Sequence, residues 1–113
     1  MKRVLITGAS GFIGRHCLKP LLVNNYEVDA VFSKQPTNSI NINNAVKWHQ
    51  VDLLDWQQSE LLVKRLQPTH LLHLAWYTAP GQYWTSIENI GWVQASLNLL
   101  QAFVVNGGQR AVI

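Results

Sequence analysis

Three glycines at three-residue intervals, Gly8, Gly11 and Gly14, stand directly behind the apolar run Val4–Ile6. Glycine has no Cβ, so it permits positive φ and lets the main chain approach a ligand closely. Unpaired N–H groups and the positive end of the dipole at the start of a following helix attract phosphate. Between a first strand and a first helix, this spacing predicts a site for the diphosphate of a dinucleotide. A tight turn that binds nothing is the alternative.

Three further motifs follow the glycines in a fixed order: Val51–Asp55, Leu72–Ala75 and Ala95–Ala102. They look like D-x-x-D, H-L-A-A and G-T-x-N-L-L-E-A, while Thr7–Gly14 looks like T-G-x-x-G-x-x-G. In this combination the chain resembles the extended short-chain dehydrogenases/reductases, also called the NAD-dependent epimerase/dehydratase family. The four motifs cover nearly the whole chain, which makes the resemblance specific.

The resemblance implies cofactor contacts at the ends of successive strands. Asp52 and Leu53 would meet the adenine, and Ala75 with Trp76 would line the nicotinamide side. The diphosphate would rest on the turn, whose implied binding residues are Gly8, Ser10, Gly11, Phe12, Ile13 and Gly14. His73 lies in an apolar strand, and we expect it to be a hydrogen-bonded core residue with no direct role.

The end of the second predicted strand bears on the choice between NAD and NADP. A carboxylate there, about 20 residues past the glycines, would hold both ribose hydroxyls and select NAD. Phe32, Ser33 and Lys34 occupy this place, and Asp29 lies too early in the strand. Because a 2′-phosphate needs cations and hydroxyl donors, we expect NADP, bound by Ser33 and Lys34, with NAD as the alternative.

No catalytic residue is assigned in this sequence. In the family that it resembles, a Tyr in Y-x-x-x-K acts as acid/base and a Ser or Thr orients the substrate. None of the three tyrosines has Lys four residues on, since the pairs are Tyr26 with Ala30, Tyr77 with Gly81 and Tyr83 with Ile87. The chain ends at Ile113, before the region where the resemblance places this group.

We therefore expect the NAD(P)-binding portion of a longer epimerase, dehydratase or reductase that acts on a nucleotide-sugar. Alone, it would bind dinucleotide without turnover. Two alternatives stay open: a non-catalytic sensor or scaffold that binds NADP, and an oligomerising fragment without a ligand.

The elements that must position these residues alternate along the chain. Apolar runs predict strands at 3–7, 28–32, 47–51, 70–75 and 110–113. Helices are predicted at 12–23, at 55–66 with Asp55 as a cap, and from Thr85 or Ser86 to about Val105, with Pro20 expected to kink or end the first. This order predicts an α/β fold, a doubly wound parallel Rossmann-like sheet with strand order 3-2-1-4-5. We expect a single domain over 1–113 that stops within or just after the fifth strand.

Composition excludes several other classes of protein. The net charge of +3 is scattered, which argues against nucleic-acid binding, and no apolar stretch is long enough to span a membrane. The four histidines show no metal-ligand spacing. Cys17 is the only cysteine, so no internal disulfide can form and a cytoplasmic location is expected.

Five aromatic residues crowd the segment after the fourth predicted strand: Trp76, Tyr77, Tyr83, Trp84 and Trp92. They would border the cleft, where they either stack on a sugar or base of the substrate or pack a loop onto the next helix. The fifth strand would be an exposed edge beside a long apolar helix. Because such surfaces promote pairing between chains, we expect a homodimer or higher oligomer.

Overall fold

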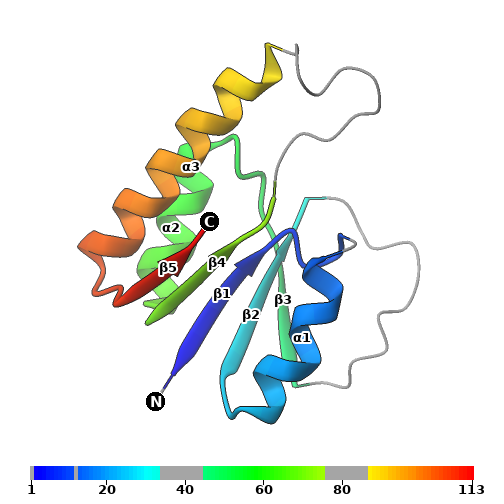
Figure 1. The fold of residues 1–113 in the computed structure, drawn as a ribbon. Coiled ribbons are helices and arrows are strands. Elements are labelled where there is room, and N and C mark those ends of the chain that lie inside the picture. The colour runs from blue at the N-terminus through cyan, green and yellow to red at the C-terminus, as the bar shows by residue number, and fades with distance from the viewer. Residues whose placement is uncertain (1, 12, 34–44, 76–86) are drawn as a thin grey trace.

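A parallel five-stranded sheet forms the centre of the protein (Figure 1). The computed structural model describes residues 2–11, 13–33, 45–75 and 87–113. Its strand order, β3-β2-β1-β4-β5, confirms the predicted order and fold class. The strands are β1 (Arg3–Thr7), β2 (Glu27–Phe32), β3 (Val46–Gln50), β4 (His70–His73) and β5 (Arg110–Val112).

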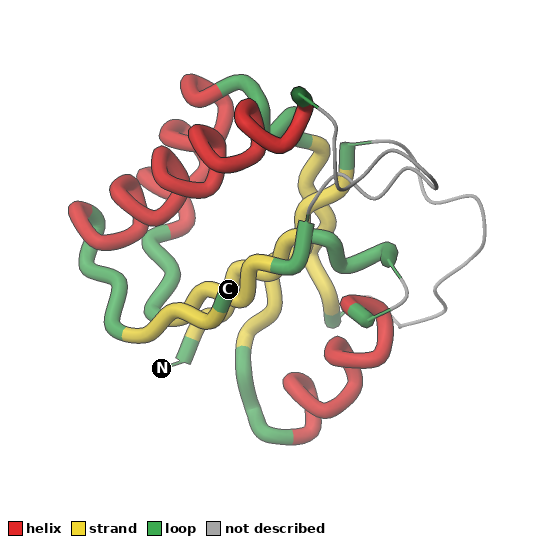
Figure 2. The backbone as a smooth tube through the Cα atoms, turned by 45° about the horizontal axis from the view of Figure 1, so that its top comes forward, coloured by secondary structure: helices red, strands yellow, loops and turns green. Residues whose placement is uncertain are grey.

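Helices cover both faces of this sheet (Figure 2). One face carries α1 (Gly14–Val23), and the other carries α2 (Trp56–Leu66) and α3 (Glu88–Val105), which pack against each other. No helix within the described ranges is long and apolar enough to cross a membrane.

Strand β1 shows why its sequence is apolar without interruption. Val4 and Ile6 belong to the core cluster under α1, whereas Leu5 belongs to the cluster under α2 and α3. Successive side chains of a strand point to opposite faces, so a strand covered on both faces needs apolar residues at every position. The first strand is therefore anchored on both sides, and the turn that follows it starts from a rigid base.

The predicted boundaries differ from the structure at two functionally relevant places. Strand β4 ends at His73 rather than residue 75, because the N–H groups of Leu74 and Ala75 turn toward the Thr7 side chain. Helix α1 begins at Gly14 and runs through Pro20 to Val23, so the proline does not end it. Thr85 and Ser86, the predicted start of the long helix, lie outside the described residues.

Candidate functional site

The predicted cofactor residues gather at one edge of the sheet. In a parallel sheet the carboxyl ends of all strands lie at the same edge. The glycine turn follows β1, Ser33 follows β2, Asp52 and Leu53 follow β3, and Ala75 follows β4. Phe12, Lys34 and Trp76 lie outside the described residues, as do Tyr77, Tyr83 and Trp84 of the aromatic segment.

At Gly8 and Gly14 the glycine turn is packed too closely against other main-chain atoms to admit a Cβ. Gly8 has a φ of +66°, and a Cβ there would stand 2.8 Å from the Ala75 nitrogen. A Cβ on Gly14 would overlap the Gly8 carbonyl oxygen. The Gly11 N–H donates to that carbonyl oxygen at 3.0 Å and closes the turn. The glycines therefore allow β1, α1 and the segment after β4 to meet at van der Waals distance.

The start of α1 has no cap from the side chain of any described residue. Ile13 is the N-cap residue, has helical φ and ψ, and is 66% exposed. No acidic residue stands in the first turn. The Arg15 and His16 N–H groups donate at 3.1 Å to the Gly11 and Ile13 carbonyl oxygens, so the feature that favours an anion here is the positive end of the helix dipole, which no acidic side chain of the first turn offsets.

The loop after β3 is held by its own hydrogen bonds. The Leu54 N–H donates to Asp52 Oδ1 at 3.0 Å, and the Asp52 N–H donates to Gln58 Oε1 at 3.0 Å. The Leu53 side chain is buried in the core under α2 and α3, so a ligand would meet its main chain. Asp52 is exposed, and its other carboxylate oxygen has no partner among the described residues.

Ser33 is exposed at the end of β2, and its carbonyl oxygen accepts a 3.4 Å hydrogen bond from Gln50 Nε2. Asp29 is buried inside the same strand, and His49 Nε2 lies 2.8 Å from its Oδ1. It therefore faces away from the sheet edge and does not supply the carboxylate that would hold a ribose.

His73 is a hydrogen-bonded core residue, as predicted, but sequence reasoning missed the two partners that it joins beneath the glycine turn. Thr7 Oγ1 lies 2.6 Å from His73 Nδ1, and Ser96 Oγ lies 2.8 Å from His73 Nε2. Thr7 and His73 are both buried, and burial lowers the pKa of the His73 imidazole. The signal lay in the motifs, because Thr7 opens the glycine motif, His73 lies within the H-L-A-A-like motif and Ser96 within the last.

Tyr26 lies just before β2, at the opposite edge of the sheet, with its ring 5.4 Å from both Lys2 Nζ and the His70 ring centroid. No three His, Cys, Asp or Glu residues in the described ranges cluster as a metal site would require.

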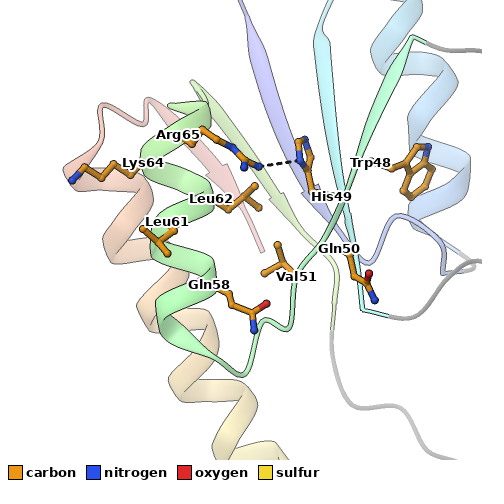
Figure 3. A pocket seen from close by; sticks show the side chains of 9 residues that line it. All are labelled: Trp48, His49, Gln50, Val51, Gln58, Leu61, Leu62, Lys64 and Arg65. Atoms are coloured by element: carbon orange, nitrogen blue, oxygen red, sulfur yellow. Dashed lines mark hydrogen bonds between the residues drawn. The ribbon is translucent and has the colours of Figure 1, made fainter.

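An open groove of about 810 Å³ lies between β3 and α2 (Figure 3). His49 points toward α2, where its Nδ1 lies 3.3 Å from Arg65 Nη2, while Trp48 points to the α1 side. None of the predicted cofactor residues lines this groove. The His49 ring pairs with Asp29 of β2 and Arg65 of α2, and these contacts stabilise that edge of the sheet.

Comparison with known proteins gives consistent matches along the chain. Residues 4–113 match the model of the NAD dependent epimerase/dehydratase family. The chain is 34% identical over 91 residues to CDP-abequose synthase of Salmonella typhimurium, and 31% identical over 91 residues to UDP-glucose 4-epimerase 2 of Arabidopsis thaliana. The crystal structure of the Thermus thermophilus UDP-glucose 4-epimerase in complex with NAD matches with a TM-score of 0.84 and 29% identity.

These matches cover most of this chain and a small part of each relative. They include 77% and 72% of this chain against the two curated relatives, but only 28% and 26% of those proteins. The Thermus structure aligns with 98% of this chain and 36% of its own. The chain thus spans about a quarter to a third of the length of the proteins that it matches.

Proposed function

The chain belongs to the NAD-dependent epimerase/dehydratase family, and from that premise we propose that its glycine turn binds the diphosphate of a nicotinamide dinucleotide. The observation that carries the proposal is the meeting of an uncapped helix start with a turn whose glycines admit no Cβ. The positive end of the helix dipole attracts a diphosphate, and the three glycines bring no side chain of their own to the turn.

The residues present fit such a cofactor. The turn would hold the diphosphate, and Asp52 with the main chain of Leu53 would hold the adenine. Ala75, together with Trp76, would line the nicotinamide side. When bound, the cofactor supplies hydride transfer, whereas the residues of this chain bind and orient it.

We propose NADP as the preferred nucleotide, on account of Ser33 and Lys34 after β2. The buried pairing of Asp29 with His49 supports this choice, because it leaves no carboxylate for the ribose hydroxyls among the described residues at this strand end. The Thermus relative was crystallised with NAD, so the two nucleotides have to be compared directly.

For the whole protein, we propose an epimerase, dehydratase or reductase that acts on a nucleotide-sugar in the cytoplasm. The names of the relatives, CDP-abequose synthase and UDP-glucose 4-epimerase, support the substrate class. The lone Cys17, which can form no internal disulfide, supports the compartment. No residue of this chain is assigned to the chemical step, so we expect the chain by itself to bind dinucleotide without turnover.

Calorimetric titration of the chain with NADP and with NAD tests the binding proposal. We expect one site per chain and tighter binding of NADP. Equal affinities would refute the NADP preference alone. If neither nucleotide binds at millimolar concentration, the dinucleotide site itself is wrong.

We also propose that the chain forms a homodimer through α3 and the edge strand β5. All three residues of β5 are exposed. Three apolar side chains spaced seven residues apart along α3, Ile90, Leu97 and Val104, are each more than 60% exposed. An apolar stripe beside an open strand edge favours association between chains.

Light scattering at micromolar concentration tests this dimer. We expect a dimeric mass for the wild-type chain and a monomeric mass for Leu97→Glu, which places a charge in the stripe. Leu61→Glu is the matched control, because Leu61 is similarly exposed but lies on α2. A monomeric wild type would refute the proposal.

A further inference from the structure

Three polar side chains join β1, β4 and α3 directly beneath the glycine turn. Thr7 is the last residue of β1, His73 is the last residue of β4, and Ser96 lies in the middle of α3. The contacts of 2.6 and 2.8 Å at the two ring nitrogens leave His73 with a hydrogen-bond partner on each side. A buried polar network of this kind orders its members when every group is satisfied.

The partners of the Thr7 hydroxyl assign the direction of each hydrogen bond. Its oxygen accepts the N–H of Leu74 at 3.0 Å and the N–H of Ala75 at 3.2 Å. A hydroxyl has two acceptor positions and one proton, so its proton is left for His73 Nδ1. The ring must then carry its own proton on Nε2, which donates to Ser96. The lowered pKa of His73 agrees with this neutral ring.

Leu74 and Ala75, whose N–H groups the Thr7 hydroxyl accepts, also lie against the glycine turn. A Cβ on Gly8 would stand 2.8 Å from both the Ala75 nitrogen and the Leu74 carbonyl carbon. Gly8 follows Thr7 directly in the sequence. The Thr7 side chain therefore binds the same Leu74–Ala75 main chain that lies against Gly8. The Leu74 N–H also donates to the Thr7 carbonyl oxygen at 3.3 Å, so the hydroxyl is the acceptor on which the Ala75 N–H in particular depends.

We propose that His73 is a positioning residue for dinucleotide binding, which acts through Thr7 to hold the Leu74–Ala75 main chain against Gly8. The inference rests on the proposed function of the turn. By accepting the Thr7 proton, the ring keeps both lone pairs of that hydroxyl directed at the two N–H groups. Ser96 keeps the ring in place from α3. Without the acceptor at Nδ1 the hydroxyl can rotate, and the Ala75 N–H loses its acceptor, whereas the Leu74 N–H keeps a 3.3 Å contact with the Thr7 carbonyl oxygen.

The first test compares hydroxyl variants by dinucleotide titration, at a temperature where circular dichroism shows each variant folded. Thr7→Val, which keeps the shape and removes the hydroxyl, should weaken binding roughly tenfold, because the Ala75 N–H loses its acceptor and the Leu74 N–H keeps only the Thr7 carbonyl oxygen. Thr7→Ser, which restores the hydroxyl, should bind like the wild type. Ser59→Ala is the matched control, since Ser59 is also buried but has no hydrogen-bond partner among the described residues and lies on α2.

A second test needs no dinucleotide and no substitution. The ¹⁵N chemical shifts of the His73 ring should show a neutral imidazole protonated at Nε2. A ring protonated at Nδ1 would overturn the proposal, because it could not accept the Thr7 proton.

Hydrogen exchange separates this proposal from the proposed function. The Ala75 amide should exchange slowly in the wild type and much faster in His73→Leu. The Leu74 amide, which also donates to the Thr7 carbonyl oxygen, should change less, and amides of α2 should remain protected. Unchanged exchange in His73→Leu, or equal binding by Thr7→Val and Thr7→Ser, would refute the positioning role. If the wild type binds neither nucleotide but shows the expected exchange, the proposed function fails and the positioning of the segment stands.

Discussion

Helices α1 and α2 begin in opposite ways, although both follow a strand of the same sheet. At the start of α2, Asp55 has extended φ and ψ, and its Oδ1 accepts the Gln57 N–H at 3.1 Å. At the start of α1, Ile13 has helical φ and ψ, and no side chain of a described residue provides a cap. The start of α2 therefore has a side-chain cap, whereas at the start of α1 the Arg15 and His16 N–H groups donate to main-chain carbonyl oxygens.

The difference shows where this protein gives up local stability. A side-chain cap stabilises a helix by about 1 kcal/mol, and α1 does without one. An acidic cap at that place would set a carboxylate where we propose the diphosphate to bind. The start of α1 is instead held by tertiary packing, because Gly14 lies against Gly8, and Gly8 lies against the segment after β4. Its rigidity therefore comes from tertiary contacts, whereas the start of α2 is set locally.

The largest expected effect comes from Gly14→Ala, which breaks the packing at the start of α1. The new Cβ would overlap the Gly8 carbonyl oxygen, so the turn must move. We expect a loss of about 1–3 kcal/mol in the free energy of unfolding and no measurable dinucleotide binding. Urea denaturation and calorimetric titration measure the two effects.

Gly91→Ala is the matched control for this substitution. Gly91 lies in α3, and the nearest atom to an added Cβ is a Leu54 side-chain carbon at 3.9 Å. This variant should gain up to about 1 kcal/mol of stability, because alanine favours the helix, and it should bind dinucleotide normally. Similar losses in both variants would mean that the close packing at Gly14 is not the cause.

A somewhat smaller effect is expected when the start of α1 receives a negative charge like that of α2. Ile13→Asp should weaken dinucleotide binding about tenfold, since the carboxylate repels the diphosphate by an energy on the order of 1 kcal/mol. Ile13→Asn, which is neutral and of similar size, is the control. If the two variants bind equally well at low salt, the diphosphate does not lie at this helix start.

Removal of the cap on α2 should affect stability more than binding. Asp55→Ala deprives the Gln57 N–H of its acceptor, and we expect a loss of about 1 kcal/mol in the free energy of unfolding. Asp55→Asn, whose side-chain oxygen can still accept, should lose less. Thermal denaturation compares the variants. A loss of binding as large as that of Gly14→Ala would show that the two helix starts are not independent.

The smallest expected effect is a pH dependence that arises from the buried His73 imidazole beneath the glycine turn. Burial lowers the pKa of His73 below its usual value of 6.5, so the unfolded chain binds a proton there more readily than the folded chain. The stability contributed by the neutral ring is complete above pH 6.5 and falls as the pH drops below it. Thermal denaturation between about pH 7.5 and 5 should show a flatter dependence of stability on pH for His73→Asn than for the wild type.

Most of the fold could be predicted from the sequence alone. The uninterrupted apolar run of β1 indicates a strand buried on both faces, and Asp55 marks the start of α2, as the structure confirms. Short apolar strands, most of them separated by a single helix, imply right-handed crossovers between parallel strands, and these yield the observed order. The glycine spacing also located the turn at the carboxyl end of β1. These features follow from local patterns of side-chain size, polarity and backbone freedom, which can be read directly from the sequence.

Only the tertiary structure decided which residues meet. It ended β4 at His73, because the next two N–H groups find a hydroxyl on another strand. It joined Thr7, His73 and Ser96, which lie up to 89 positions apart in the sequence, and it turned Asp29 inward to His49. A buried polar group must find its partner across the core, and that partner is set by how the elements pack.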